Sequence, residues 1–148
     1  MKLPRHLQKL FSYKFKIKPE YTWKQYILIR TDRAFSLGKL MVHSAHNSCS
    51  ALLFEWQRKA RTWKKSVRIR EWFNSGLCQA KIVCRVKDED ALRAWIDRVQ
   101  RYNPDIPFAM IPDGGAYEVE ASCVIGAAIG PITEGEAVEL GLKELKLY

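Results

Sequence analysis

The chain has 148 residues, and 25 Lys and Arg against 16 Asp and Glu give it a formal net charge of +9. Apolar residues make up 47% and charged residues 28%, a composition that excludes disordered and fibrous proteins and supports one domain with a core of its own. The charge is uneven, because residues 1–74 carry net +13 and residues 75–148 net −4. Such a basic half attracts polyanions, so a nucleic acid is the expected partner and an anionic membrane surface is the alternative.

The cysteines argue against a metal site. Cys49, Cys78, Cys84 and Cys123 form no C-x-x-C pair and have no zinc spacing with the three histidines. No nucleotide-binding glycine motif is present either, so we expect neither a metal nor a nucleotide cofactor. The longest apolar stretch, 121–132, is about half of the roughly 20 residues that a membrane helix needs. We therefore expect no integral membrane segment and a cytoplasmic protein.

Residues 1–22 are predicted to be a basic N-terminal extension to a domain that covers 23–148. The first nineteen residues mix basic with apolar side chains and contain no acid. Three interpretations stay open: an arm that contacts phosphate, a mitochondrial transit peptide, or a solvated tail docked through Phe11 and Phe15.

Apolar periodicity and helix-breaking residues predict the elements of the domain in chain order. They are a strand at 25–30, a helix at about 38–59, a second helical stretch up to 76, a strand at 80–86, a helix at 88–102, strands at 108–111 and 124–129, and a helix at 134–145. Gly130 and Pro131 are expected to end the last strand. Because helices connect strands, we predict an α/β fold: a three-layer α/β/α sandwich with a four-stranded mixed, mostly parallel sheet.

The helix at about 38–59 is amphipathic, and its polar side is a candidate site. At 100° per residue one side is apolar: Met41, Ala45, Cys49, Leu52 and Trp56. The opposite side carries Lys39, His43, His46 and Ser50. This polar stripe begins just beyond the end of the first strand, where open α/β sheets bind ligands. A solvated helix face is the alternative.

The turn at 112–115 is a second candidate, because it also follows the end of a strand. It places the Asp113 carboxylate beside Gly114 and Gly115, which let a backbone approach a ligand closely. The alternative is an ordinary Asx-type turn.

A third candidate is the stretch 55–76, where basic residues alternate with Trp56, Trp63 and Trp72. Basic and aromatic side chains together suit phosphates and bases, so we expect RNA contacts here, and packing of the Trp side chains on the core is the alternative. The residues expected to contact RNA are Arg58, Lys59, Arg61, Lys64 and Lys65.

Short motifs in the same order give the chain a family resemblance from about Trp23 to Tyr148. They are K-Q-Y-I-L-I-R-T-D at 24–32, G-K-x-x-x-x-x-x-H at 38–46, Q-A-K-I-V at 79–83, K-D-E at 87–89, I-x-D-x-G at 111–115, I-G-P at 129–131 and the closing L-K-L-Y. In these motifs the chain resembles the class II, archaeal and eukaryotic type, peptidyl-tRNA hydrolases.

The resemblance implies a hydrolase that uses water to cleave the ester between a peptide and the tRNA 3′ end, without a cofactor and often as a homodimer. It implies functional residues at Lys39, His46, Asp113, Asp32 and Lys81. With the residue analysis, we expect Lys39, His43 and Asp113 to be catalytic, and His46, Asp32 and Lys81 to join the basic cluster in binding tRNA.

The chain also departs from the family pattern. Leu37 stands where the family has Lys, His43 where it has Gln, and Ala116 and Tyr117 where it has Arg and Thr. These departures leave two alternatives open: a family member with weakened or lost chemistry that binds tRNA or another RNA, and an adaptor that contacts proteins at a membrane surface.

Overall fold

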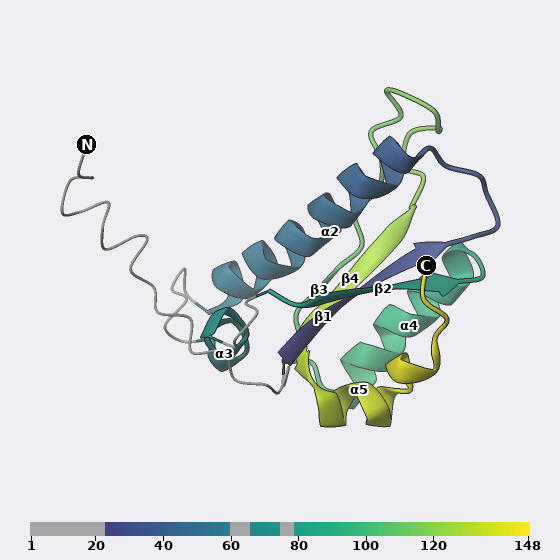
Figure 1. Cartoon of the computed structure of the whole chain (residues 1–148). Helices are drawn as coiled ribbons and strands as arrows, with labels where there is room; N and C mark the ends of the chain where they lie inside the picture. The colour runs from purple at the N-terminus through teal and green to yellow at the C-terminus, as the bar shows by residue number, and fades with distance from the viewer. Residues whose placement is uncertain (1–22, 60–65, 75–78) are drawn as a thin grey trace, which may run out of the picture.

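The structure is a computed structural model that describes residues 23–59, 66–74 and 79–148 (Figure 1). Its elements are β1 (Trp23–Arg30), α2 (Leu37–Arg58), α3 (Val67–Asn74), β2 (Lys81–Val86), α4 (Glu89–Tyr102), β3 (Phe108–Ala109), β4 (Gly126–Thr133), α5 (Glu134–Leu140) and the short 3-10 helix η2 (Leu142–Glu144). The predicted extension, residues 1–22, lies outside the described residues.

The four strands form one mixed sheet in the order β2-β1-β4-β3. β2 pairs with β1 in parallel, whereas β4 is antiparallel to both of its neighbours, β1 and β3. Figure 1 shows α2 along one side of the sheet and α4 and α5 on the other. The predicted α/β fold with helices on both faces of a four-stranded mixed sheet is confirmed.

The expectation of a mostly parallel sheet is wrong. The crossover argument holds for direction, since β1, β2 and β3 all run the same way. It does not predict which strands are adjacent. β4 lies antiparallel between β1 and β3, so β1–β2 is the one parallel pair of the sheet described. Helices between strands predict strand direction but do not predict which strands become neighbours.

Apolar side chains fill both sides of the sheet. Alternation along β1 sends Tyr26 and Leu28 into the layer shared with α4 and α5, and Ile27 and Ile29 into the layer shared with α2. All four are at most 1% exposed. β1 is therefore covered on both faces, which fixes the position of the loop that follows it toward α2.

β4 continues through Gly130 and Pro131, which were expected to end it. The pairing between β1 and β4 shifts register opposite this pair, and a proline is tolerated there because a bulge needs no ladder N–H. The buried Gln25 side chain fills the irregularity: its Nε2 donates to Gly130 O at 3.3 Å, and its Oε1 accepts from Ser48 Oγ at 2.6 Å. The same side chain thus links β1, β4 and α2.

The orientation of α2 differs from the one that its apolar periodicity predicts. Met41 is 64% exposed and Cys49 is exposed, so the apolar stripe faces outward. The buried face is largely polar because its groups find partners: Asn47 Oδ1 accepts from the Ile111 backbone N–H at 2.8 Å, and the Glu55 carboxylate accepts from the hydroxyl of Ser66. The buried residues of α2 are Leu40, His43, Asn47, Ser48, Ala51 and Glu55.

The last helix is shorter than predicted. α5 ends at Leu140 because Gly141 adopts a left-handed conformation, with φ of 80°, that closes the helix. The 3-10 helix η2 replaces the rest of the expected helical stretch up to 145.

Candidate active site

The first turn of α2 holds the candidate site in place. Ser36 caps the helix, with its Oγ accepting from the Lys39 backbone N–H at 3.1 Å. Lys39 and His43 are one turn apart, so both side chains leave the same side of the helix. That side faces the loop between β3 and β4, which carries Asp113 and lies beside the start of α2 (Figure 1).

Asp113 joins the two predicted candidates into one cluster. Its Oδ2 accepts from Lys39 Nζ at 2.7 Å and lies 2.5 Å from His43 Nε2, and its Oδ1 accepts from the Gly115 N–H at 2.7 Å. The Asp113 side chain is 7% exposed, the Lys39 side chain 11% and the His43 side chain 4%. Lys39 and Asp113 are 74 positions apart in sequence, and the structure brings the two side chains together, which the sequence alone left open.

The electrostatics of the cluster keep Asp113 ionised. The hydrogen bond from Lys39, followed by those from the Gly115 backbone and from His43, holds the pKa of Asp113 well below its usual range. An ionised carboxylate can only accept, so His43 Nε2 carries the hydrogen that it shares with Asp113. His43 Nδ1 is buried and has no hydrogen-bond partner among the residues that the structure describes.

Two further acidic residues bind the loop after Asp113 to the segment between β1 and α2, which contains Arg33 and Ser36. The Glu118 carboxylate accepts from the Ser36 backbone N–H at 3.1 Å and from the Ser36 hydroxyl at 2.5 Å. Glu120 accepts from both terminal nitrogens of Arg33, at 2.5 and 2.9 Å. These contacts hold the loop around Asp113 at two points beyond the cluster itself.

The loop should loosen in acid. The Arg33 guanidinium lowers the pKa of Glu120 to about 2, so the Arg33–Glu120 pair stabilises fully above the unfolded value of about 4.3 and is lost as the pH falls toward 2. We expect the thermal midpoint to fall more between pH 5 and 2 in the wild type than in Glu120→Gln, which lacks this titration. Equal pH dependence of the two midpoints in calorimetry would contradict this role.

The other predicted tRNA-binding residues do not all join the cluster. His46 is exposed, with its ring centroid 5.7 Å from that of His43. Asp32 pairs with Arg30 through two oxygens, at 2.7 and 2.6 Å, and so closes the end of β1. Lys81 begins β2, opposite Gln25 and therefore at the other end of the strands, with its Nζ 4.9 Å from the centroid of the Trp72 ring.

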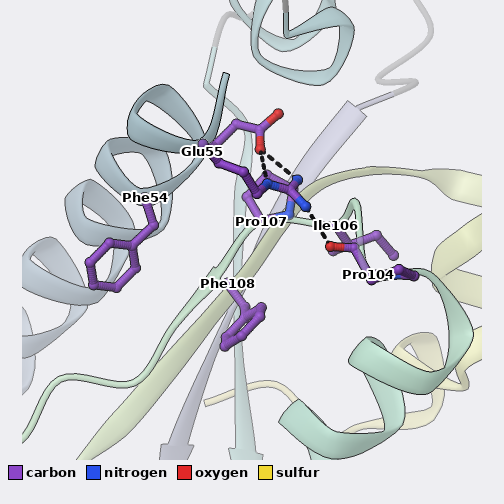
Figure 2. A pocket seen from close by; sticks show the side chains of 7 residues that line it. Phe54, Glu55, Pro104, Ile106, Pro107 and Phe108 are labelled. Carbon is purple, nitrogen blue, oxygen red and sulfur yellow. Dashed lines mark hydrogen bonds and ion pairs between the residues drawn. The ribbon is translucent and has the colours of Figure 1, made fainter. Parts of the chain in front are cut away.

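Two residues of the predicted basic cluster, Arg58 and Lys59, lie in the described part of the chain and bind groups of the protein itself. Arg58 donates to the Glu55 carboxylate at 2.6 Å and to Pro104 O at 2.6 Å, and Lys59 lies 3.5 Å from the Asp105 carboxylate. Figure 2 shows the hollow of about 330 Å³ beside these bonds, with Phe54 and Phe108 at its sides. The other three predicted RNA contacts, Arg61, Lys64 and Lys65, lie outside the described residues.

Sequence reasoning missed the residues that position the cluster. Asn47 donates to His43 O at 2.9 Å and binds the backbone just after β3, so it links the helix turn of His43 to the strand that leads to Asp113. The spacing of four between His43, Asn47, Ala51 and Glu55 was the available signal, since it marks one helix face. No spacing rule relates Glu118 to Ser36, whose bond depends on the path of the loop.

Within the described ranges, no three His, Cys, Asp or Glu side chains come together in a way that could hold a metal ion. Cys84 and Cys123 are buried and free. None of the helices described is long and apolar enough to cross a membrane.

The family model for peptidyl-tRNA hydrolase PTH2 matches residues 23–148. The chain belongs to the PTH2 family. A peptidyl-tRNA hydrolase of Staphylothermus marinus is 36% identical over 109 residues, covering 74% of this chain and 82% of the relative. One of Sulfolobus acidocaldarius is 32% identical over 129 residues, covering 84% and 98%.

PTH2 membership confirms the predicted family and supports the hydrolase over the alternative of a binding module without chemistry. The matched range also begins at Trp23, where β1 starts. Every residue of the Lys39, His43 and Asp113 cluster falls inside it.

Proposed function

We propose that the chain hydrolyses peptidyl-tRNA at Lys39, His43 and Asp113, with water as the nucleophile. The observation that carries the proposal is the Asp113 Oδ2 atom, which binds Lys39 and His43 at the same time, at 2.7 and 2.5 Å. An ester of this kind is activated, so a positioned cation and a positioned base suffice and no covalent intermediate is required.

In this proposal Lys39 stabilises the negative charge that forms on the ester oxygen. Its ammonium group lies at the start of α2, where the helix dipole also favours negative charge. Negative charge develops on the ester carbonyl oxygen as water adds, and a cation that is already in place stabilises it without reorganisation. Asp113 holds the ammonium group in position.

His43 fits the role of general base better than Asp113 does. A carboxylate whose pKa is strongly lowered by Lys39 is a weak base, and its oxygens are already occupied by three donors. By accepting from Nε2, Asp113 leaves the lone pair of His43 on Nδ1; an acidic residue orients the histidine of a triad in the same manner, but with the two ring nitrogens exchanged. Because Nδ1 is buried, the reacting water must enter beside the helix when the substrate binds.

The test is single-turnover hydrolysis of peptidyl-tRNA by the purified protein, which we expect the wild type to carry out. His43→Leu removes both the base and the donor to Asp113 and should be about 10²-fold slower or more, whereas His43→Gln keeps a donor and restores the residue that the family has at this position. A wild type that leaves peptidyl-tRNA intact would overturn the proposal, and an unchanged rate in His43→Gln would move the base elsewhere.

A homodimer and a cytoplasmic location, where translation supplies the substrate, are part of the proposal. The outward side of α2 supports self-association, because Val42 and Leu53 are 49% and 48% exposed. Two copies related by a twofold axis would each present this same face. We expect a dimer in light scattering and a monomer for Leu53→Glu; a monomeric wild type would contradict it.

A further inference from the structure

Among the elements that the structure describes, none covers β2 on the side of the sheet where α2 lies. Lys81, Val83 and Arg85 alternate along β2 with residues of the layer under α4, so they point to the face that α2 covers elsewhere. The register agrees, because Val83 and Arg85 pair with Ile27 and Ile29, which pack under α2. All three β2 side chains are nevertheless exposed. Figure 1 shows β2 at the edge of the sheet.

The last residues of the chain widen this open face. Arg85 N donates to Lys146 O at 2.8 Å and Tyr148 N to Val83 O at 3.0 Å, so residues 146–148 run antiparallel along the outer edge of β2. Alternation then puts Lys146 and Tyr148 on the same face as Arg85, whose guanidinium carbon lies 5.4 Å from the centroid of the Tyr148 ring. We call this surface the β2 platform: Lys81, Val83, Arg85, Lys146 and Tyr148.

The cations of the platform differ from those of the basic half of the chain. Every Lys and Arg described between residues 23 and 74 lies within 4 Å of an acidic side chain: Lys24, Arg30, Arg33, Lys39, Arg58, Lys59, Arg68 and Arg70. Lys81, Arg85 and Lys146 form no ion pair with any acidic residue in the described part of the chain. The charges of Arg85 and Lys146 are therefore available to an external anion, whereas Lys81 Nζ also donates to Gln79 O at 3.3 Å and lies over the Trp72 ring.

We propose that the β2 platform binds single-stranded RNA, with Lys81, Arg85 and Lys146 contacting phosphates and Tyr148 stacking on a base. A single-stranded nucleic acid offers phosphates along a flexible backbone and flat bases that can stack. The cations spaced along the exposed β-strand can contact the phosphates, and the exposed ring can stack on a base. An anionic membrane surface would use the charges but not the ring.

The identity of the bound RNA rests on the proposed function, under which the single-stranded RNA on the platform is the unpaired 3′ end of the tRNA. β2 and β3 are three strand spacings apart, about 14 Å, and Asp113 follows β3. An RNA strand on the platform can therefore deliver its terminal ester to the start of α2 within a few nucleotides. This arrangement also gives Lys81 a role at a distance from Asp113.

Two double variants with the same loss of charge test the platform. Arg85→Gln/Lys146→Gln removes two platform cations, and Arg98→Gln/Arg101→Gln removes two from α4 on the opposite side of the sheet, where Arg98 likewise stacks on an aromatic ring, that of Trp95. Binding of the full chain to deacylated tRNA and to a single-stranded 12-nucleotide RNA is measured by fluorescence anisotropy. We expect about tenfold weaker binding and a salt slope smaller by about 1.4 for the platform variant, and less than twofold weaker binding for the control.

The stacking contact is tested by Tyr148→Ala against Tyr148→Phe. The alanine variant should bind at least about fivefold more weakly, and the phenylalanine variant like the wild type. Equal weakening by both double variants, no binding of either RNA, or binding to anionic vesicles in place of RNA would overturn the proposal. Since deacylated RNA carries no ester, platform-dependent binding by a protein without hydrolysis would retain the platform and reject the proposed function alone.

Discussion

Asp113→Asn is expected to lower the single-turnover rate of peptidyl-tRNA hydrolysis by 10² to 10⁴ while the chain stays folded. Asparagine keeps the shape and an acceptor for the Gly115 N–H, so the turn is conserved. It removes the charge that holds Lys39 and orients His43, both of which bind the same Asp113 oxygen. Lys39→Met should cause a loss of similar size, because it removes the cation itself.

The two substitutions should not add. Residues that act as a unit lose most of their effect with the first change, so we expect the Lys39→Met/Asp113→Asn rate to be within about tenfold of the slower single variant. Asp97→Asn on the exposed side of α4 is the matched control, and its rate should equal that of the wild type. Additive losses would mean that Lys39 and Asp113 act on separate steps, and no loss in Asp113→Asn would remove Asp113 from the mechanism.

Gly115→Ala is expected to be the most damaging change that leaves every functional side chain in place. Gly115 has φ of +77°, and a Cβ there would lie 2.4 Å from the Ala121 backbone N. The loop must move to relieve this contact, at a cost of about 1–3 kcal/mol, and the Gly115 N–H would leave Asp113. Since a displacement of about 1 Å can reduce a rate by about 10²-fold, activity should fall by at least that factor.

The neighbouring glycine provides the control for this prediction. A Cβ on Gly114 would meet no atom within 4 Å, so Gly114→Ala should retain the wild-type rate and thermal midpoint. Both variants are compared by single-turnover hydrolysis and by calorimetry. If Gly115→Ala kept full activity, the backbone position of Asp113 would not be critical to the reaction.

Much of the fold and part of the candidate site can be predicted from the sequence. The strands and helices follow local periodicity, and the candidates Lys39, His43 and Asp113 each stand near the end of a strand, so a rule about strand ends is enough to single them out. Residues such as Glu118 and Asn47 cannot be found in this way. Their partners, Ser36 and the Ile111 backbone, are reached only through the path of the loop after β3.

α2 shows why periodicity can mislead about direction. An apolar stripe marks the buried side of a helix only when the surface that the helix packs against is itself apolar. Here the sheet and its loops offer the Gln25 amide, the Ile111 N–H and the Asp113 carboxylate, and the polar side of the helix satisfies them. Two of these partners, Ile111 and Asp113, lie more than sixty positions away from the helix residues that bind them. A local sequence pattern therefore cannot predict which face of α2 is buried.

The position of β4 between β1 and β3 has a consequence for synthesis of the chain. β1, which is made first among the described elements, finds its inner neighbour only when residues 126–133 have appeared, about 100 residues later. Until then its edge is unpaired and the layers on both sides of it are incomplete, so a nascent chain cannot reach the native sheet by stages. We therefore expect folding to be a late, single event that follows the synthesis of residues 126–133, in which the core and the cluster around Asp113 form together.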